Sequence, residues 1–128
     1  MADSLHLDTH AVVWIGAKEY DRFPKAVVER INDSQLMISP TVILELQYLA
    51  ERKKVPGSPF KIIEGLQATI GLEICPDSFE WVVKASLNLH WTRDPFDRLI
   101  VAQASLSKAP LLTKDREILR HYSHAVWD

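Results

Sequence analysis

The feature that most constrains the fold is the alternation of very short apolar segments with longer amphipathic ones. Short, mostly apolar segments fall at 5–7, 36–38, 72–74 and 111–113, with a further one at 125–127. Segments of this kind are typical of parallel strands that are buried on both faces. We therefore predict an α/β fold with a short, mostly parallel sheet of four to five strands, covered by helices on both faces.

The segments between these strands carry signals for helices. Ser39-Pro40 and Asp94-Pro95 each place a capping side chain directly before a proline, which is well accepted at the first position of a helix. Apolar side chains then recur at helical spacing. We expect helices that begin at about residue 11 and that span about 24–31, 40–53, 59–69, 78–87, 95–108 and 117–120.

Composition fits one globular domain over residues 1–128. Hydrophobic residues make up 47% and charged residues 25% of the chain, enough apolar material for one sizeable core. No apolar run approaches the ~20 residues of a membrane span, and no signal peptide is evident. Cys75 is the only cysteine, so no internal disulfide can form. We expect a reducing compartment, most simply the cytoplasm, and a core position for Cys75, because no His or Lys lies beside it.

The net charge of the chain limits the classes of function that it can have. A net charge of −2 argues against a generic basic nucleic-acid-binding protein. It does not exclude nucleic acid, because a site built from carboxylates lowers the net charge until its cations bind. The histidines lack the spacing of zinc ligands, and neither a glycine-rich phosphate loop nor a nucleophile-elbow serine is present.

Four acidic residues fall where a parallel sheet builds its ligand site. Asp8 and Asp115 follow predicted strands by one or two residues. Glu45 lies on the helix that leaves the carboxyl end of the second strand, and Asp97 lies in the first turn of the helix that leads into the fourth. If the first and fourth strands are neighbours, all four acids can meet at one edge. Asp94 and Asp97 also have a structural explanation, as helix cap and as partner of the helix dipole. Glu45 can equally be an exposed residue on the outer face of its helix.

A shared pocket for four carboxylates would require a cation. Like charges at close range raise pKa values strongly, and a hard divalent cation removes this conflict. Oxygen ligands without His or Cys favour Mg²⁺ or Mn²⁺ over Zn²⁺. Such a site suits phosphoryl chemistry.

The acids belong to a series of motifs that occur in a fixed order. These are Leu7-Asp8-Thr9-His10, Ser39-Pro40 with Glu45, Asp94-Pro95-Phe96-Asp97-Arg98 followed by Leu99-Ile100-Val101-Ala102-Gln103-Ala104, and Leu111-Leu112-Thr113-Lys114-Asp115. The series resembles PIN-domain ribonucleases, in particular VapC-type toxins of prokaryotic toxin–antitoxin pairs, and it covers nearly the whole chain. The resemblance implies a three-layer α/β/α sandwich and a Mg²⁺- or Mn²⁺-dependent endoribonuclease, the toxin of a type II system. It also implies a homodimer and a cognate antitoxin protein that blocks the site.

The resemblance also implies roles for individual residues. Asp8, Glu45, Asp97 and Asp115 would be the catalytic, metal-binding acids, and a metal-activated water would attack an RNA phosphodiester to release 3′-hydroxyl and 5′-phosphate ends. Thr113 would orient these acids by hydrogen bonds, Thr9 would help to fix the turn after Asp8, and Asp94 would act mainly as the helix cap, with support of the site as the alternative. The cations that flank the acids, as contacts for RNA phosphates or as solvated surface charge, are Arg93, Arg98, Lys114 and Arg116.

Two other functions remain open at this point. The chain could be a catalytically silent PIN scaffold that binds RNA or a protein, although the intact acid set argues against it. A phospho-signalling receiver domain also gathers acids at strand ends, but it needs paired acids after the first strand, where this chain has only Asp8. Trp14 and Trp91 could stack nucleobases, although packing in the core or at a dimer contact is the simpler expectation.

Overall fold

A computed structural model describes residues 3–55 and 57–128. Strands and helices alternate along most of the chain, as predicted. The strands are β1 (Ser4–Leu7), β2 (Gln35–Ile38), β3 (Glu73–Ile74), β4 (Leu111–Leu112) and β5 (Ala125–Val126). The helices are α1 (Thr9–Gly16), α2 (Lys25–Asp33), α3 (Pro40–Glu51), α4 (Pro59–Ile70), α5 (Phe79–Ser86), α6 (Pro95–Ser105) and α7 (Arg116–His121), with a 3-10 helix at Tyr20–Arg22.

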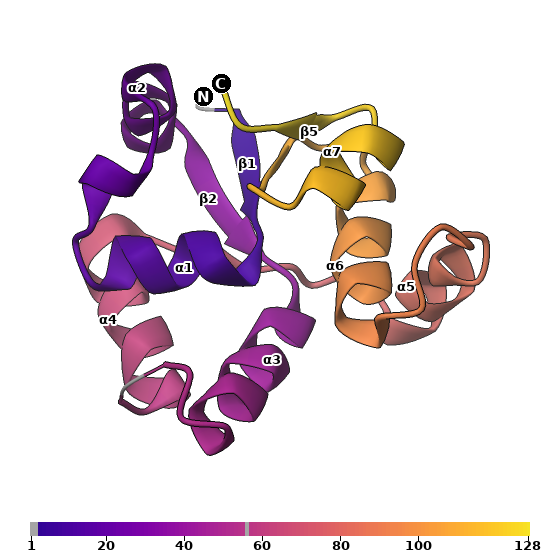
Figure 1. The fold of residues 1–128 in the computed structure, drawn as a ribbon, viewed down its shortest axis with the longest axis horizontal. Coiled ribbons are helices and arrows are strands. Elements are labelled where there is room, and N and C mark those ends of the chain that lie inside the picture. The colour runs from indigo at the N-terminus through magenta and orange to yellow at the C-terminus, as the bar shows by residue number, and fades with distance from the viewer. Residues whose placement is uncertain (1–2, 56) are drawn as a thin grey trace.

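The five strands form one parallel sheet in the order β3-β2-β1-β4-β5. Leu5 of β1 is in register with Leu36 of β2, and Leu7 pairs with Leu112 of β4. The chain builds the sheet in one direction from β1 to β3 and then crosses back to place β4 on the other side of β1 (Figure 1). Strand order therefore reverses between β1 and β4, where parallel sheets bind their ligands. This confirms the predicted fold class, and it meets the condition under which the four acids could gather at one edge, that the first and fourth strands are neighbours.

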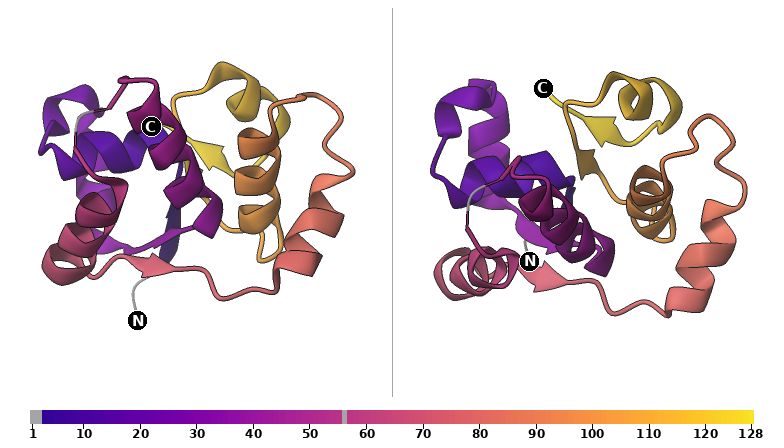
Figure 2. Two further views of the ribbon diagram at one scale, coloured as in Figure 1. Left: turned by 90° about the horizontal axis from the view of Figure 1, so that it is seen from below. Right: turned by 60° about the horizontal axis from the view of Figure 1, so that its bottom comes forward.

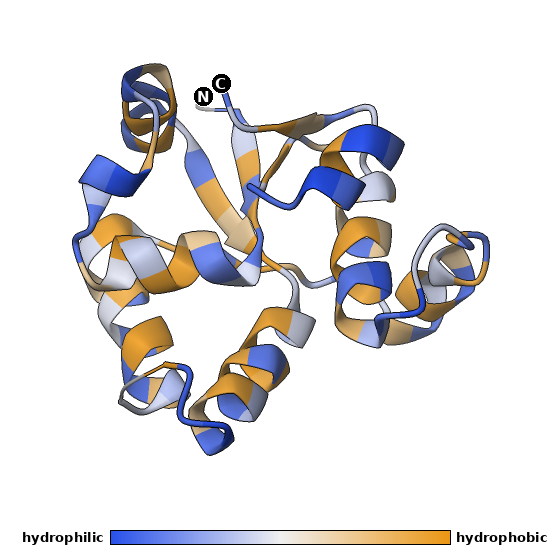
Figure 3. Cartoon of the chain, viewed as in Figure 1, coloured by the Kyte–Doolittle hydropathy of each residue, from blue (hydrophilic) through white to orange (hydrophobic). Residues whose placement is uncertain are grey.

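Helices surround the sheet (Figure 2). The central strands supply fully buried side chains, including Leu5, Leu36 and Leu111. Helix α6 packs against both α5 and α3, and α4 packs against α1 and α3. Figure 3 shows hydrophobic residues along the strands, whereas α7 is mostly hydrophilic. None of the helices within residues 3–55 and 57–128 is long and apolar enough to cross a membrane.

The structure differs from the prediction mainly at the ends of elements. Helix α6 stops at Ser105 rather than near Lys108, because Lys108 adopts a left-handed conformation with φ of 52° that ends the turn. The 3-10 helix at Tyr20–Arg22 was not predicted, since three residues carry no periodic signal. No separate turn follows Asp8, because α1 begins at Thr9 directly after β1.

Candidate functional site

One pocket collects all four predicted acids at the strand-order reversal. It has a volume of about 440 Å³, and its lining residues lie on α1, α3 and α6 or directly before α1, α6 and α7. The elements explain this meeting, because β1 and β4 end side by side and each leads directly into a helix. The pocket is lined by Asp8, His10, Trp14, Glu45, Asp94, Asp97, Lys114 and Asp115.

Asp8 lies deepest among these acids. Only 7% of its surface is exposed. Its Oδ1 accepts a hydrogen bond of 2.8 Å from the backbone N–H of Thr9, so Asp8 caps α1. Burial raises the pKa of Asp8, and the hydrogen bonds from Thr113 and Thr9 and the nearby His10 only partly oppose this effect. The carboxylate is thus fixed in position while its charge is incompletely compensated.

Thr113 joins two of the acids across the sheet. Its Oγ1 donates a hydrogen bond of 2.6 Å to Oδ2 of Asp8 and accepts one of 3.0 Å from the backbone N–H of Asp115. A hydroxyl can do both at once because it has one proton and two lone pairs. Thr113 is fully buried at the end of β4. Thr113 thus holds the carboxylate of Asp8 and the backbone of Asp115 in place, while its role at a metal stays a prediction of the family resemblance.

Glu45 faces the pocket rather than the outer surface. It is half-buried on α3 and accepts a hydrogen bond from the Thr9 hydroxyl. The alternative of an exposed outer-face glutamate is therefore wrong. Burial raises the pKa of Glu45, with smaller contributions in the same direction from Asp8 and Asp94. Thr9 is the first residue of α1 and not part of a turn, but it does contact the site.

Asp94 and Asp97 have different roles in the structure at the start of α6. Oδ1 of Asp94 accepts hydrogen bonds from the backbone N–H groups of Phe96 (2.8 Å) and Asp97 (3.2 Å), which is the predicted cap. Asp97, half-buried in the first turn, has its pKa raised to about 8. Burial is the largest cause, and the like charge of Asp94 is the next. Asp97 therefore carries its negative charge in the pocket at an electrostatic cost.

Asp115 also caps a helix, which the sequence did not indicate. Its Oδ1 accepts hydrogen bonds from the backbone N–H groups of Glu117 (2.8 Å) and Ile118 (3.0 Å) at the start of α7. The side chain is exposed at the pocket rim. Asp8, Asp94 and Asp115 therefore each begin a helix whose positive dipole end points at the acids.

Comparison with known proteins identifies the family. The sequence matches the PIN domain over residues 5–124. The chain belongs to the PIN-domain family. Its fold is similar to that of a chain in the crystal structure of VapBC2 from Rickettsia felis bound to a DNA fragment from their promoter, with a TM-score of 0.65 and 21% sequence identity. This match covers 98% of the present chain and 99% of the other. A search of curated proteins gave no match.

Membership of the PIN family indicates a general class of function. PIN domains are typically nucleases and usually depend on a metal. In the part of the chain that the structure describes, no three His, Cys, Asp or Glu side chains are already arranged to hold a metal ion. The donors nevertheless fit a hard divalent cation, because they are all carboxylates and three of them have raised pKa values. Among the described residues, the ion pairs lie elsewhere and leave the pocket acids without a cationic partner.

The four predicted RNA-contacting cations occupy different environments in the PIN fold. Lys114 lines the acid pocket. Nε of Arg98 instead donates a hydrogen bond of 2.7 Å to the carbonyl oxygen of Thr92, which holds the segment before α6. Arg93 and Arg116 are exposed but are not among the residues that line the pocket. Of these four cations, Lys114 alone is among the residues that line the acid pocket.

Two histidines have closer neighbours than the sequence suggested. His10 lines the acid pocket, and its position two residues after Asp8, in the first turn of α1, was the available signal. Nδ1 of His6 lies 3.8 Å from the Cys75 sulfur, so the premise that no histidine lies beside Cys75 is wrong. The expected core position is nevertheless confirmed, since Cys75 is buried and burial raises its pKa to about 12. A thiol in that state is not a nucleophile.

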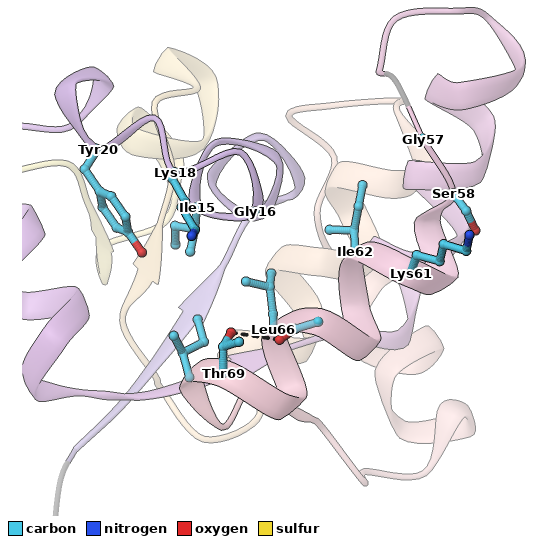
Figure 4. A pocket seen from close by; sticks show the side chains of 12 residues that line it. Ile15, Gly16, Lys18, Tyr20, Gly57, Ser58, Lys61, Ile62, Leu66 and Thr69 are labelled. Atoms are coloured by element: carbon cyan, nitrogen blue, oxygen red, sulfur yellow. Dashed lines mark hydrogen bonds between the residues drawn. The ribbon is translucent and has the colours of Figure 1, made fainter.

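A second cavity lies at the other end of α1 and carries no acids. It measures about 530 Å³ and lies between α1 and α4 (Figure 4). Ile15, Ile62 and Leu66 form part of its apolar lining, with Lys18 and Lys61 as its charged residues. Its chemistry suits apolar contact rather than catalysis, so the acid pocket is the candidate active site.

Proposed function

We propose that this chain is a Mg²⁺- or Mn²⁺-dependent endoribonuclease and the toxin of a type II toxin–antitoxin pair. One observation carries the proposal. Four carboxylates share one pocket at the strand-order reversal of a PIN fold, and none of them forms an ion pair in the described part of the chain. Such a cluster is unfavourable by itself and becomes favourable when a divalent cation binds.

Each residue of the pocket has a task in this proposal. Asp8, Glu45, Asp97 and Asp115 would hold the metal, and Thr113 and Thr9 would keep Asp8 and Glu45 in place through their hydroxyl groups. A bound divalent cation would lower the pKa of the attacking water and stabilise the leaving oxygen of the phosphodiester.

The cations would bind the RNA chain on either side of the bond that is cut. Lys114, at the pocket wall, would contact a phosphate of the substrate, with Arg93 and Arg116 further out along the chain. Arg98, which already bonds to a carbonyl oxygen, would contribute mainly by holding the segment before α6.

Protein partners are the second part of the proposal. The solved VapBC2 structure is a complex bound to promoter DNA, and by analogy we infer a cognate antitoxin for this chain. The surface offers apolar anchors for partners, since Phe79 is 68% exposed and Trp81 is 61% exposed on α5. We also infer a homodimer, which light scattering of the purified protein would test.

The decisive test is cleavage of RNA with and without metal. The purified chain should cut RNA when Mg²⁺ or Mn²⁺ is added and should stop when a chelator is added. Asp8→Asn and Asp97→Asn should each lose about 100-fold or more in rate, because removing even a residue behind the metal ligands typically costs about 10- to 100-fold. Glu64→Gln, which alters an exposed carboxylate on α4, is the matched control and should keep the parent's rate.

A catalytically silent scaffold makes the opposite prediction. It is favoured by the absence, in residues 3–55 and 57–128, of three side chains already arranged around a metal. Such a protein would bind RNA equally well in chelator and would show no cleavage with either metal. If Asp8→Asn and Asp97→Asn cut RNA as fast as the parent, the assignment of the acids to the active site is wrong.

A further inference from the structure

One wall of the acid pocket is aromatic and has no part in holding the acids. Trp14 of α1 lines the same pocket as Asp97 and Lys114. Its ring packs against the edges of Phe23, with ring centroids 5.7 Å apart, and Trp127, at 6.0 Å. These contacts fix the plane of the indole. Because Trp14 is only half-buried, part of its ring remains available to a molecule in the pocket.

Two cations already gather at this indole. The Arg22 guanidinium carbon lies 5.3 Å from the ring centroid and the Lys114 nitrogen lies 5.9 Å from it. Arg22 is also paired with Glu19, whereas Lys114 is exposed and belongs to the pocket lining. The electron-rich ring face that attracts cations is also the face on which nucleobases stack. A nucleotide offers both partners at once, a base for the ring and a phosphate for the lysine.

We propose that Trp14 and Lys114 form a nucleotide subsite beside the acids. The indole stacks on an unpaired base next to the phosphodiester at the acids, and the Lys114 ammonium group contacts the phosphate attached to that base. The inference rests on the proposed ribonuclease function and names the two residues that would contact a base and its phosphate beside the bond that is cut. A base can lie flat on the indole only when it is unpaired, because bases in a duplex are covered by their neighbours. A pocket of about 440 Å³ is within the usual range for a small-ligand site.

Core packing alone would give Trp14 a different signature. If the ring served only to fill space against Phe23 and Trp127, its removal would lower stability and weaken every ligand to the same extent. A stacking residue instead affects only ligands that carry a base. The comparison that separates the two roles is a short oligoadenylate against a chain of the same length made of abasic ribose phosphates.

Binding is measured by fluorescence anisotropy with Mg²⁺ present, in the Asp97→Asn background, so that no turnover is needed. We expect the starting protein to bind oligoadenylate more tightly than the abasic chain. Trp14→Leu should reduce that preference by about 5- to 100-fold, and Trp14→Phe should retain much of it. Lys114→Ala should weaken both chains by a similar factor. Phe60→Leu, which removes an exposed aromatic ring on α4, is the matched control and should change neither.

A photochemical measurement avoids the risk that Trp14→Leu does not fold. An oligonucleotide carrying 5-iodouridine should crosslink to the peptide containing Trp14 in the otherwise unaltered chain. The subsite is refuted if the protein shows no preference for bases, if Trp14→Leu weakens both chains equally, or if the crosslink maps elsewhere. Base preference with the crosslink at Trp14 but no RNA cleavage would instead support the subsite and sink the nuclease proposal.

Discussion

Replacing Asp97 by asparagine should stabilise the metal-free protein while abolishing its activity. Burial and four like charges raise the pKa of Asp97 from 3.8 to about 8. An acid whose pKa is higher in the folded state than in the unfolded chain binds its proton more tightly when folded. Its contribution to stability therefore falls as the pH rises from about 4 to about 8. Asparagine has no charge to bury, so the variant should not lose this stability.

The size of this stability difference follows from the pKa shift of Asp97 and from the solvent exposure of its side chain. A rise of about four pKa units corresponds to about 5–6 kcal/mol for a fully shielded group. Asp97 is only half-buried, and solvent screening reduces this figure to about 1–2 kcal/mol. In chelator at about pH 8.5, Asp97→Asn should thus exceed the parent by that amount, or by about 3–8 °C in Tm. The difference should shrink towards about pH 5.

Urea unfolding in chelator at several pH values measures this difference directly. Glu64→Gln removes an exposed carboxylate from α4 and should leave the parent's pH dependence unchanged. Adding Mg²⁺ should stabilise the parent more than the variant, because the cation binds the charged site. Equal stability of parent and Asp97→Asn at the higher pH, or a difference that does not vary with pH, would refute the electrostatic reasoning.

Three further predictions concern two supports of the pocket and the buried thiol of Cys75. Thr113→Val keeps the shape of the side chain but removes its hydrogen bond to the buried Asp8 carboxylate. This variant should lower the free energy of unfolding by about 2 kcal/mol. Thr113→Ser retains the hydroxyl and should lower it clearly less. Asp94→Ala should cost about 1 kcal/mol through the lost cap of α6, whereas Ser78→Ala, at a cap position without a side-chain hydrogen bond, should cost little. Urea midpoints measure both pairs, and equal losses within a pair would contradict the assigned contacts. Cys75 should resist an aromatic disulfide reagent up to about pH 9, because burial keeps its pKa near 12; fast labelling of the folded protein would show that the thiol is accessible.

Local signals in the sequence were sufficient for most of the fold. Asp94 was predicted as a cap because the residue and the proline after it define a helix start by themselves. Buried parallel strands could be located because they lack polar alternation. The cap by Asp115 was missed, since its flanking charges resemble an ordinary exposed loop. The contact of His6 with Cys75 joins residues 69 positions apart, and no local pattern encodes such a distance.

The candidate site was predictable for a different reason. Where the acids fall relative to strand ends is a local property, but their meeting depends on β4 lying beside β1. The sequence allowed that adjacency without requiring it, so the meeting of the four acids could be stated only as conditional on it. Details that depend on side-chain direction, such as Glu45 turning towards Thr9 instead of solvent, could not be decided from helical spacing alone. The positions of the acids at the strand ends are therefore easier to predict from the sequence than the hydrogen bonds that hold their side chains.

Helix capping and metal binding are compatible tasks for the same carboxylate. At Asp94 and Asp115 the cap engages Oδ1, so one oxygen fixes the backbone while the other can face the pocket. The helix starts in turn direct positive dipole ends at the acids and offset part of their mutual repulsion. That offset is incomplete, because the pKa of Asp97 still rises to about 8. The fold thus brings the acids together at a cost that a divalent cation would remove, which links the stability of this PIN domain to the loading of its site.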